Sequence, residues 1–123
     1  MHAAPFKNHF FYLQATAVLY QGKAFLILGP PGCGKSRLAY GLIQKGGKLF
    51  NDDLVYLEQG EKKIILHPLP RYAGCLYLRG YGFLAVPFQT HDTQIHGLIL
   101  LGGAPIPRPF SKRNLHNLFI LRR

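Results

Sequence analysis

The chain is short of acidic residues and cysteines, and these shortages narrow the kinds of protein it can be. Only 5 of its 123 residues are Asp or Glu, against 15 Lys and Arg, so the formal net charge is +10. A chain of this charge favours acidic partners, such as nucleotides, nucleic acids or acidic protein surfaces. Its 2 cysteines are too few for a disulfide framework and are typical of a reducing cytoplasm, where we expect the protein to be located.

Long apolar runs and RNA-binding patterns are also absent from the sequence. No stretch reaches the roughly 18 apolar residues that a membrane-spanning helix needs, so we expect no membrane partner. No basic run is interleaved with aromatic residues, so nucleic acid is not the expected partner either. Apolar residues nevertheless make up 48% of the chain, which predicts one compact domain over residues 1–123. From about residue 102 onward Gly, Pro and basic residues dominate, and no helix or strand is predicted there.

One glycine-rich segment matches the phosphate-binding loop pattern (P-loop) at every required position. It follows an apolar run at residues 24–28, which predicts a buried strand, and it precedes residues 37–43, whose apolar side chains recur at helical spacing. Backbone N–H groups of such a loop surround phosphate oxygens, and the helix N-terminus adds its positive dipole. We therefore predict binding of a nucleoside triphosphate or a similar polyphosphate. The predicted binding residues are Gly29, Pro30, Pro31, Gly32, Cys33, Gly34, Lys35, Ser36 and Arg37.

Three residues of this motif have individual interpretations. Lys35 is predicted to reach the β- and γ-phosphates, and the Ser36 hydroxyl is predicted to hold Mg²⁺. Cys33 lies between two glycines, where its backbone N–H would face phosphate, and its side chain is interpreted as a small tolerated residue.

The rest of the pattern predicts an α/β fold that is rich in strands and has one clearly indicated helix, directly after the P-loop. The helix is expected to end at Lys45, because a glycine pair follows it in the manner of a C-cap. Most P-loop proteins alternate strand and helix throughout, so a strand-rich chain is unusual among them. The predicted strands are residues 13–20, 24–28, 48–50, 54–57, 63–66, 76–78, 83–86 and 95–101.

An acidic pair, Asp52 and Asp53, follows the short strand that comes after the helix. Ligands of parallel α/β sheets bind at the carboxyl ends of the strands. A carboxylate at that edge can coordinate Mg²⁺ or accept the proton of an attacking hydroxyl group. Successive residues of an extended segment point to opposite sides, so one carboxylate is predicted to face the metal and the other the acceptor.

These motifs together resemble the C-terminal kinase domain of the HPr kinase/phosphorylase family, in a short form that lacks the N-terminal domain. The family order is the P-loop, a helix leading through glycine into a strand that ends in Asp-Asp, and then an Arg-Gly-x-Gly segment, here residues 79–82. The resemblance extends from residue 13 to about residue 86. It implies the strand-rich P-loop NTP-binding domain of that family. Tyr72, Tyr77 and Tyr81 are interpreted as packing residues around the Arg-Gly-x-Gly segment.

The resemblance also implies an activity, namely ATP-dependent phosphorylation of a serine on the phosphocarrier protein HPr. Some members of the family run the reverse reaction as well. ATP and Mg²⁺ are then the cofactors, with Ser36 and Asp52 as metal ligands. Asp53, with Asp52 as the second candidate, is implied as the base, and Arg79 as the residue that stabilises phosphate charge. The implied partners are an HPr-type phosphocarrier, the nucleotide and further copies of the chain in a homo-oligomer.

Two positions depart from the family pattern. Tyr77 stands where the family has a glutamate two residues before the arginine, and Gln14 stands where it has a histidine. Tyrosine is neutral at pH 7 and glutamine cannot carry a proton, so both differences argue against the reverse reaction. Two other functions stay open on the sequence: a non-catalytic nucleotide- or nucleic-acid-binding protein, and a small-molecule kinase, which would need more helices and an arginine-bearing lid.

Overall fold

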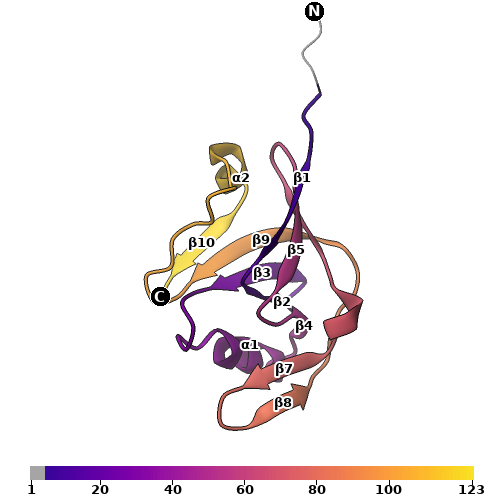
Figure 1. Cartoon of the computed structure of the whole chain (residues 1–123), viewed down its shortest axis with the longest axis vertical. Helices are drawn as coiled ribbons and strands as arrows, with labels where there is room; N and C mark the ends of the chain where they lie inside the picture. Colours follow the sequence, from indigo (N-terminus) through magenta and orange to yellow (C-terminus); the bar gives the residue numbers. More distant parts are fainter. Residues whose placement is uncertain (1–4) are drawn as a thin grey trace, which may run out of the picture.

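The computed structural model describes residues 5–123, which form one large curled sheet, a separate two-stranded hairpin and two helices (Figure 1). The helices are α1 (Lys35–Gln44) and α2 (Lys112–His116), and a single 3₁₀ turn lies at Pro70–Tyr72. The strands are β1 (His9–Leu13), β2 (Thr16–Tyr20), β3 (Lys23–Leu28), β4 (Lys48–Asn51), β5 (Val55–Gln59), β6 (Ile64–His67), β7 (Cys75–Leu78), β8 (Gly82–Ala85), β9 (Thr93–Leu100) and β10 (Phe119–Arg122). Within this part of the chain, neither helix is long and apolar enough to cross a membrane.

The order of strands brings the carboxyl ends of β3 and β4 to the same edge of the sheet. The large sheet runs β1-β5-β6-β9-β3-β2-β4, and β10 pairs with β9 beside this path. Strand β2 is antiparallel to both β3 and β4, so β3 and β4 run in the same direction. The P-loop follows β3 and the acidic pair follows β4. The topology therefore places the two predicted parts of the site side by side.

Helix α1 contains the predicted helical residues 37–43 and ends where the sequence predicts. It starts directly after Gly34, whose φ of 100° is in the left-handed region. It ends before Lys45, and Gly46 with φ 103° then lets the chain turn into β4. Ala39 and Ile43 are buried against the sheet, which fixes the helix over β2 and β4. The predicted helix and the glycine C-cap are thus confirmed.

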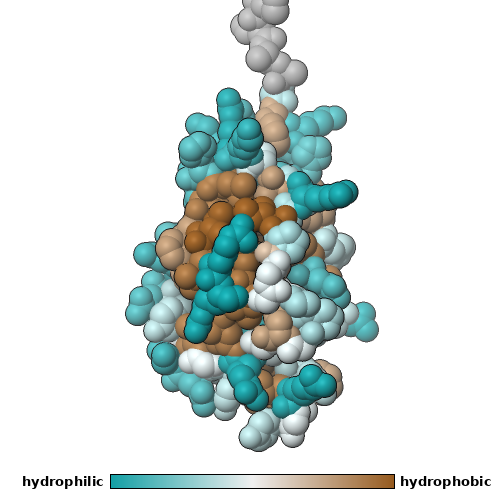
Figure 2. Space-filling model, turned by 90° about the vertical axis from the view of Figure 1, so that its left-hand side faces the viewer, coloured by the Kyte–Doolittle hydropathy of each residue, from teal (hydrophilic) through white to brown (hydrophobic). Residues whose placement is uncertain are grey.

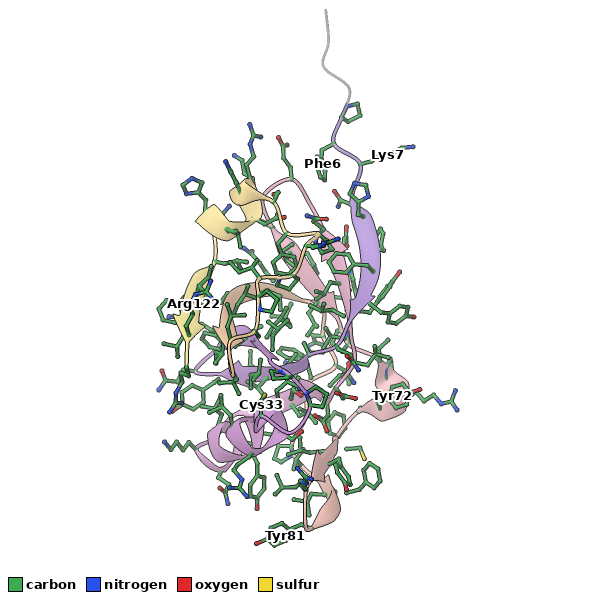
Figure 3. All side chains as sticks on the ribbon, turned by 60° about the vertical axis from the view of Figure 1, so that its left-hand side comes forward. Phe6, Lys7, Cys33, Tyr72, Tyr81 and Arg122 are labelled. Atoms are coloured by element: carbon green, nitrogen blue, oxygen red, sulfur yellow. The ribbon has the colours of Figure 1, made fainter. Side chains whose placement is uncertain are left out.

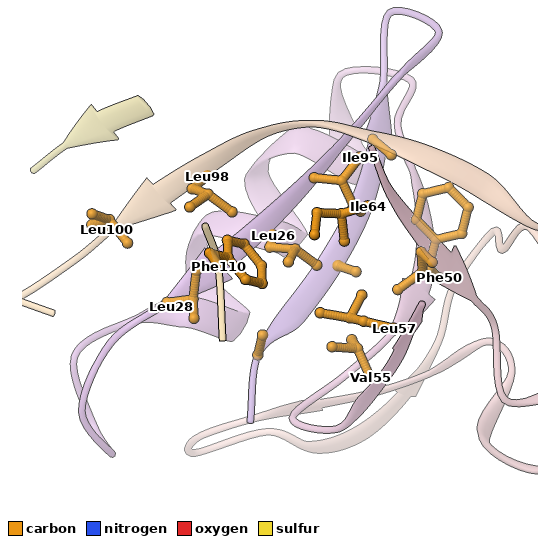
Figure 4. Close-up of a cluster of buried hydrophobic side chains, with 14 of the residues drawn as sticks. Leu26, Leu28, Phe50, Val55, Leu57, Ile64, Ile95, Leu98, Leu100 and Phe110 are labelled. Atoms are coloured by element: carbon orange, nitrogen blue, oxygen red, sulfur yellow. The ribbon is translucent and has the colours of Figure 1, made fainter. Parts of the chain in front are cut away.

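The larger part of the core lies inside the curl of the sheet, on the face away from α1 (Figure 4). Alternate residues of β3, β5 and β6 point into it, as a half-buried strand requires. Burial of this much apolar surface is the main favourable term in the folding free energy. The buried side chains include Leu26, Leu28, Phe50, Val55, Leu57, Ile64, Ile95, Leu98, Leu100 and Phe110.

Two segments differ from the sequence prediction. The strand predicted over residues 13–20 is confirmed for residues 16–20 but is not continuous from residue 13, because the chain leaves β1 at Leu13 and starts β2 at Thr16. Strand β1 pairs with β5, whereas β2 pairs with β3 and β4, so the two intervening residues carry the chain from one side of the curled sheet to the other. In the C-terminal segment, where no element is predicted, the structure has α2 and the parallel strand β10.

A cluster around His67 joins β5 and β6 to the segment before β9. The Nε2 atom of His67 lies 2.7 Å from Oε1 of Glu58, and its Nδ1 atom lies 3.1 Å from Oδ2 of Asp92. Partial burial lowers the pKa of His67, but the hydrogen bonds and charges of Glu58 and Asp92 outweigh it, so the pKa is raised overall. The pKa of Glu58 is lowered, first by a hydrogen bond from Asn8 and then by the one from His67.

These shifts predict how stability depends on pH. The contribution of His67 is fully present below its unfolded pKa of 6.5 and is lost as the pH rises through its raised folded value. That of Glu58 is present above 4.5 and is lost as the pH falls through its lowered folded value. In His67→Gln, thermal unfolding followed by circular dichroism should show a smaller loss of Tm between about pH 6 and about pH 8 than the wild type. The variant His116→Gln, at an exposed position of α2, is the control, and an equal decline in wild type and His67→Gln would contradict the assignment.

Candidate active site

The P-loop wraps around the space where phosphate would bind, and glycine backbone geometry shapes it. Gly32 has φ 79° and Gly34 has φ 100°, a region that L-residues with a side chain rarely adopt. The ammonium group of Lys35 folds back onto the loop and donates hydrogen bonds to the carbonyl oxygens of Gly29, at 2.8 Å, and Pro30, at 3.3 Å. The exposed prolines 30 and 31 form the outer bend. Lys35 is thus held at the loop that it is predicted to serve.

Gly29 is required by the close approach of three segments. A Cβ atom at this position would lie 2.3 Å from Sγ of Cys33 and 3.0 Å from the carbonyl oxygen of Leu101. Cys33 is half-buried and fills the space beside this glycine, so its side chain has a packing role here (Figure 3). The thiol therefore turns inward, while its backbone stays in the loop.

Replacement of this glycine provides a test of the loop geometry. In Gly29→Ala the loop must shift away from Cys33 and Leu101, and we expect the affinity for Mg-ATP to fall about tenfold or more, or about 1.4 kcal/mol. Isothermal titration calorimetry measures this change. The matched control is Gly41→Ala in α1, where nothing lies within 4 Å of the added methyl group and affinity should not change. Equal affinities in all three proteins would show that the loop does not hold the nucleotide.

Asp52 is the centre of a hydrogen-bond network that joins four segments. Its Oδ1 atom accepts hydrogen bonds from the hydroxyl groups of Ser36 and Thr16, each at 2.9 Å. Its Oδ2 atom accepts a hydrogen bond at 2.9 Å from the backbone N–H of Tyr77. The carboxylate therefore connects the end of β4 to β2, α1 and β7. Contacts from three directions fix its position beside the P-loop.

The pair formed by Ser36 and Asp52 suits a magnesium ion that is bound together with a nucleotide. A hydroxyl oxygen and a carboxylate oxygen are the protein ligands typical of Mg²⁺ in P-loop proteins, where phosphates and water complete the octahedron. Within residues 5–123 there is no cluster of three or more His, Cys, Asp or Glu side chains that could hold a metal alone. A metal at this pair would therefore depend on the phosphates for its remaining ligands. The residues present fit Mg²⁺ in that form.

Asp53 differs from Asp52 in both conformation and exposure. Its φ is 67°, and the N–H of Leu54 donates to the carbonyl oxygen of Asp52 at 2.8 Å, which closes a tight three-residue turn around it. Such turns with positive φ are rare and strained. The backbone N–H of Asp53 donates to the hydroxyl of Thr16 at 3.3 Å, and the side chain is exposed. The two carboxylates have different surroundings, as predicted. The reason is the left-handed turn at Asp53, and not the alternation of side chains along an extended segment that the sequence analysis expected.

Arg79 reaches the P-loop from a distant segment of the chain. It follows β7 in the turn of the β7–β8 hairpin, and its Nη1 atom lies 3.5 Å from the position of a Cβ atom on Gly32. The guanidinium group is therefore close to the loop that would hold phosphate. Arg37, by contrast, is exposed on the first turn of α1. The structure thus brings Lys35, Ser36, Asp52 and Arg79 together around one loop.

The structure also shows one residue that the sequence analysis missed. Thr16, fully buried at the start of β2, donates a hydrogen bond to Asp52 and accepts one from the backbone of Asp53. Gln14, two residues earlier, is exposed between β1 and β2. Nothing in the sequence separates Thr16 from other strand threonines, because its role depends on where β2 crosses the end of β4. The nearest available signal is that Thr16 is a polar residue at the start of the β2–β3 hairpin.

Comparisons with known proteins agree with the motifs. No protein-family model matches the chain. It is 37% identical over 75 residues to the HPr kinase/phosphorylase of Clostridium tetani, which covers 61% of this chain and 25% of the relative. It is 33% identical over 95 residues to that of Shouchella clausii, which covers 76% of this chain and 27% of the relative. The chain therefore spans about a quarter of the length of the curated relatives that it matches.

A solved structure shows the same fold. The Hpr(Ser) kinase/phosphatase from Coxiella burnetii superimposes with a TM-score of 0.66 and 23% sequence identity, over 80% of this chain and 65% of that one. Its similarity confirms the strand-rich α/β architecture with few helices. The predicted resemblance of this chain to the P-loop domain of HPr kinase/phosphorylases is therefore confirmed, by sequence in the curated relatives and by fold in the solved structure.

Proposed function

We propose that this chain transfers the γ-phosphate of ATP to a serine hydroxyl of an HPr-type phosphocarrier protein. One observation carries the proposal. The Ser36 hydroxyl and the Asp52 carboxylate lie 2.9 Å apart at the P-loop, and the exposed carboxylate of Asp53 follows directly in the chain. This arrangement provides metal ligands and a free base at one edge of the sheet. The names of the curated relatives support the choice of acceptor.

Binding of ATP would change the partners of Lys35. In the structure its ammonium group donates hydrogen bonds to the carbonyl oxygens of Gly29 and Pro30. With nucleotide bound, it would turn toward the β- and γ-phosphates, where its hydrogen bonds are assisted by charge on both partners. Ser36 and Asp52 would hold Mg²⁺, which neutralises charge on the phosphates. Arg79, near Gly32, would stabilise the charge that develops during transfer.

Asp53 is the better candidate for the base. Both oxygens of Asp52 already accept hydrogen bonds, whereas the side chain of Asp53 is exposed. Asp53 would accept the proton of the serine hydroxyl as the serine oxygen bonds to the γ-phosphorus. The bond from that phosphorus to the bridging oxygen breaks, and ADP leaves. We limit the proposal to this forward direction, because Gln14 is exposed and cannot carry a proton.

We propose that residues 1–123 act as a single domain in the cytoplasm, where the free thiols of Cys33 and Cys75 stay reduced. We also propose that copies of the chain associate. Phe119 and Leu121 of the edge strand β10 are exposed, and the molecule carries an apolar surface on this side (Figure 2). Light scattering of the purified protein tests the association.

The acceptor class is tested by ADP formation. With Mg-ATP, we expect ADP to form when the phosphocarrier is present and to stop when the acceptor serine of the carrier is replaced by alanine. Shikimate and nucleoside monophosphates should give no ADP, which separates a protein kinase from a small-molecule kinase. ADP formation with the small molecules alone would overturn the proposal. Salt-sensitive binding of nucleic acid without any ATP turnover would support a non-catalytic binding protein instead.

A further inference from the structure

We propose that the outward face of the β7–β8 hairpin binds the acceptor protein. The matching surface of the acceptor would be net acidic and would carry an apolar patch around the acceptor serine. This inference rests on the proposed function and names the surface that would recognise the acceptor. The docking face is defined by three aromatic residues of the hairpin: Tyr77, Tyr81 and Phe83.

The hairpin has one face that packs and one that does not. Leu76 is fully buried against the core beneath α1, and it is paired in register with Leu84. The neighbouring register pair, Tyr77 and Phe83, must point to the opposite face, because side chains alternate along a strand. Their rings contact each other edge to face, with centroids 5.1 Å apart. The outward face of the hairpin therefore carries two aromatic rings that are in contact with each other.

The docking face is unusually exposed for aromatic side chains. Tyr81 is 77% exposed, Phe83 74% and Tyr77 48%. The sequence interpretation of Tyr77 and Tyr81 as packing residues is therefore wrong, and Tyr72 is exposed as well. A two-stranded hairpin is only marginally stable in water, and aromatic rings that stay in solvent do not add to the stability of the fold. Aromatic residues gathered on one exposed face are typical of a protein interface, where rigid rings bury large areas.

The charge around the hairpin favours an acidic partner. Residues 62–91 contain no Asp or Glu. Arg71 lies over the ring of Tyr72, 5.9 Å from its centroid, and Arg79 stands in the hairpin turn. If two copies of the chain met through this face, the same arginines of each copy would be brought together, and like charges repel. The aromatic and basic surface therefore fits an acidic acceptor protein better than it fits self-association.

The hairpin also borders the reacting groups directly. The backbone N–H of Tyr77 donates to Asp52, and Arg79 lies beside Gly32 of the P-loop. In Figure 3, Tyr81 marks the tip of the hairpin, at the end of the molecule opposite to Phe6. A protein bound to the docking face would thus meet the P-loop and the acidic pair at once. A serine at the centre of its apolar patch could reach Asp53.

The test compares steady-state kinetics of two variants with the same phosphocarrier. In Tyr81→Ser/Phe83→Ser we expect the KM for the carrier to rise about tenfold, while kcat and the KM for ATP stay near wild type, because only docking is lost. Phe6→Ser is the control, since Phe6 is also an exposed aromatic residue but lies away from the hairpin. An unchanged KM for the carrier in the double variant would overturn the docking face.

A second measurement keeps the inference separate from the proposed function. The amide signals of ¹⁵N-labelled protein are followed as unlabelled carrier is added. If wild-type protein transfers no phosphate, the proposed function fails, but changes concentrated at residues 77–83 still support the docking face. Absence of such changes overturns it. Changes caused by phosphatidylglycerol vesicles, with none caused by the carrier, also overturn it and identify a membrane surface as the occupant.

Discussion

Asp53→Asn is expected to lower the rate of phosphoryl transfer by about 10²–10⁴-fold, with little effect on the affinity for Mg-ATP. The amide has the shape of the carboxylate but cannot accept the serine proton. Asparagine also adopts positive φ readily, so the turn with φ 67° at this position should be kept. Single-turnover measurement of phosphorylated carrier, with calorimetric titration of Mg-ATP alongside, gives both quantities.

Two comparisons make this prediction specific. Asp92→Asn removes a carboxylate that contacts His67 in a different part of the structure, so the transfer rate should stay near wild type. Asp52→Asn changes the group that accepts hydrogen bonds from Ser36 and Thr16, so a higher Mg²⁺ requirement should accompany its loss of rate. A transfer rate in Asp53→Asn within a few-fold of wild type would rule out Asp53 as the base.

Lys35→Ala is expected to weaken Mg-ATP binding by about 100-fold or more, which corresponds to about 2.7 kcal/mol. The ammonium group is the one that can turn from the carbonyl oxygens of Gly29 and Pro30 to the phosphates. Because the side chain makes only these two hydrogen bonds to the loop, the Tm should change little. Lys48→Ala, at an exposed position of β4, is the matched control and should bind as the wild type does. Equal affinities in Lys35→Ala and wild type would show that ATP binds elsewhere.

Local sequence rules predict the part of the site that is continuous in the chain. The loop that ends at Gly34, helix α1 and its glycine C-cap follow from spacing and backbone chemistry, and the structure has them where they are expected. The strand before the acidic pair is also predicted from the local sequence. The ends of these two segments then meet because β3 and β4 run in the same direction, which the order of strands decides.

The parts that sequence reasoning missed depend on contacts between distant segments. Thr16 becomes part of the site only because β2 crosses the end of β4, and β1 separates from β2 because the chain changes neighbours in the sheet. Strand β10 is stabilised by its parallel pairing with β9, which its short and partly basic sequence does not indicate. The exposure of the aromatic residues of the hairpin could not be predicted either, because a buried hairpin would have the same sequence pattern.

In the proposed reaction the P-loop binds ATP, Ser36 and Asp52 hold Mg²⁺, and Asp53 accepts the proton of a protein serine that receives the phosphate. The most direct measurement is the intact mass of a purified HPr-type phosphocarrier after incubation with this protein and Mg-ATP, followed by fragmentation to find the modified residue. We predict a gain of one phosphate on a serine, lost in both Lys35→Ala and Asp53→Asn. A carrier of unchanged mass, under conditions where wild-type protein binds ATP, would contradict the claim.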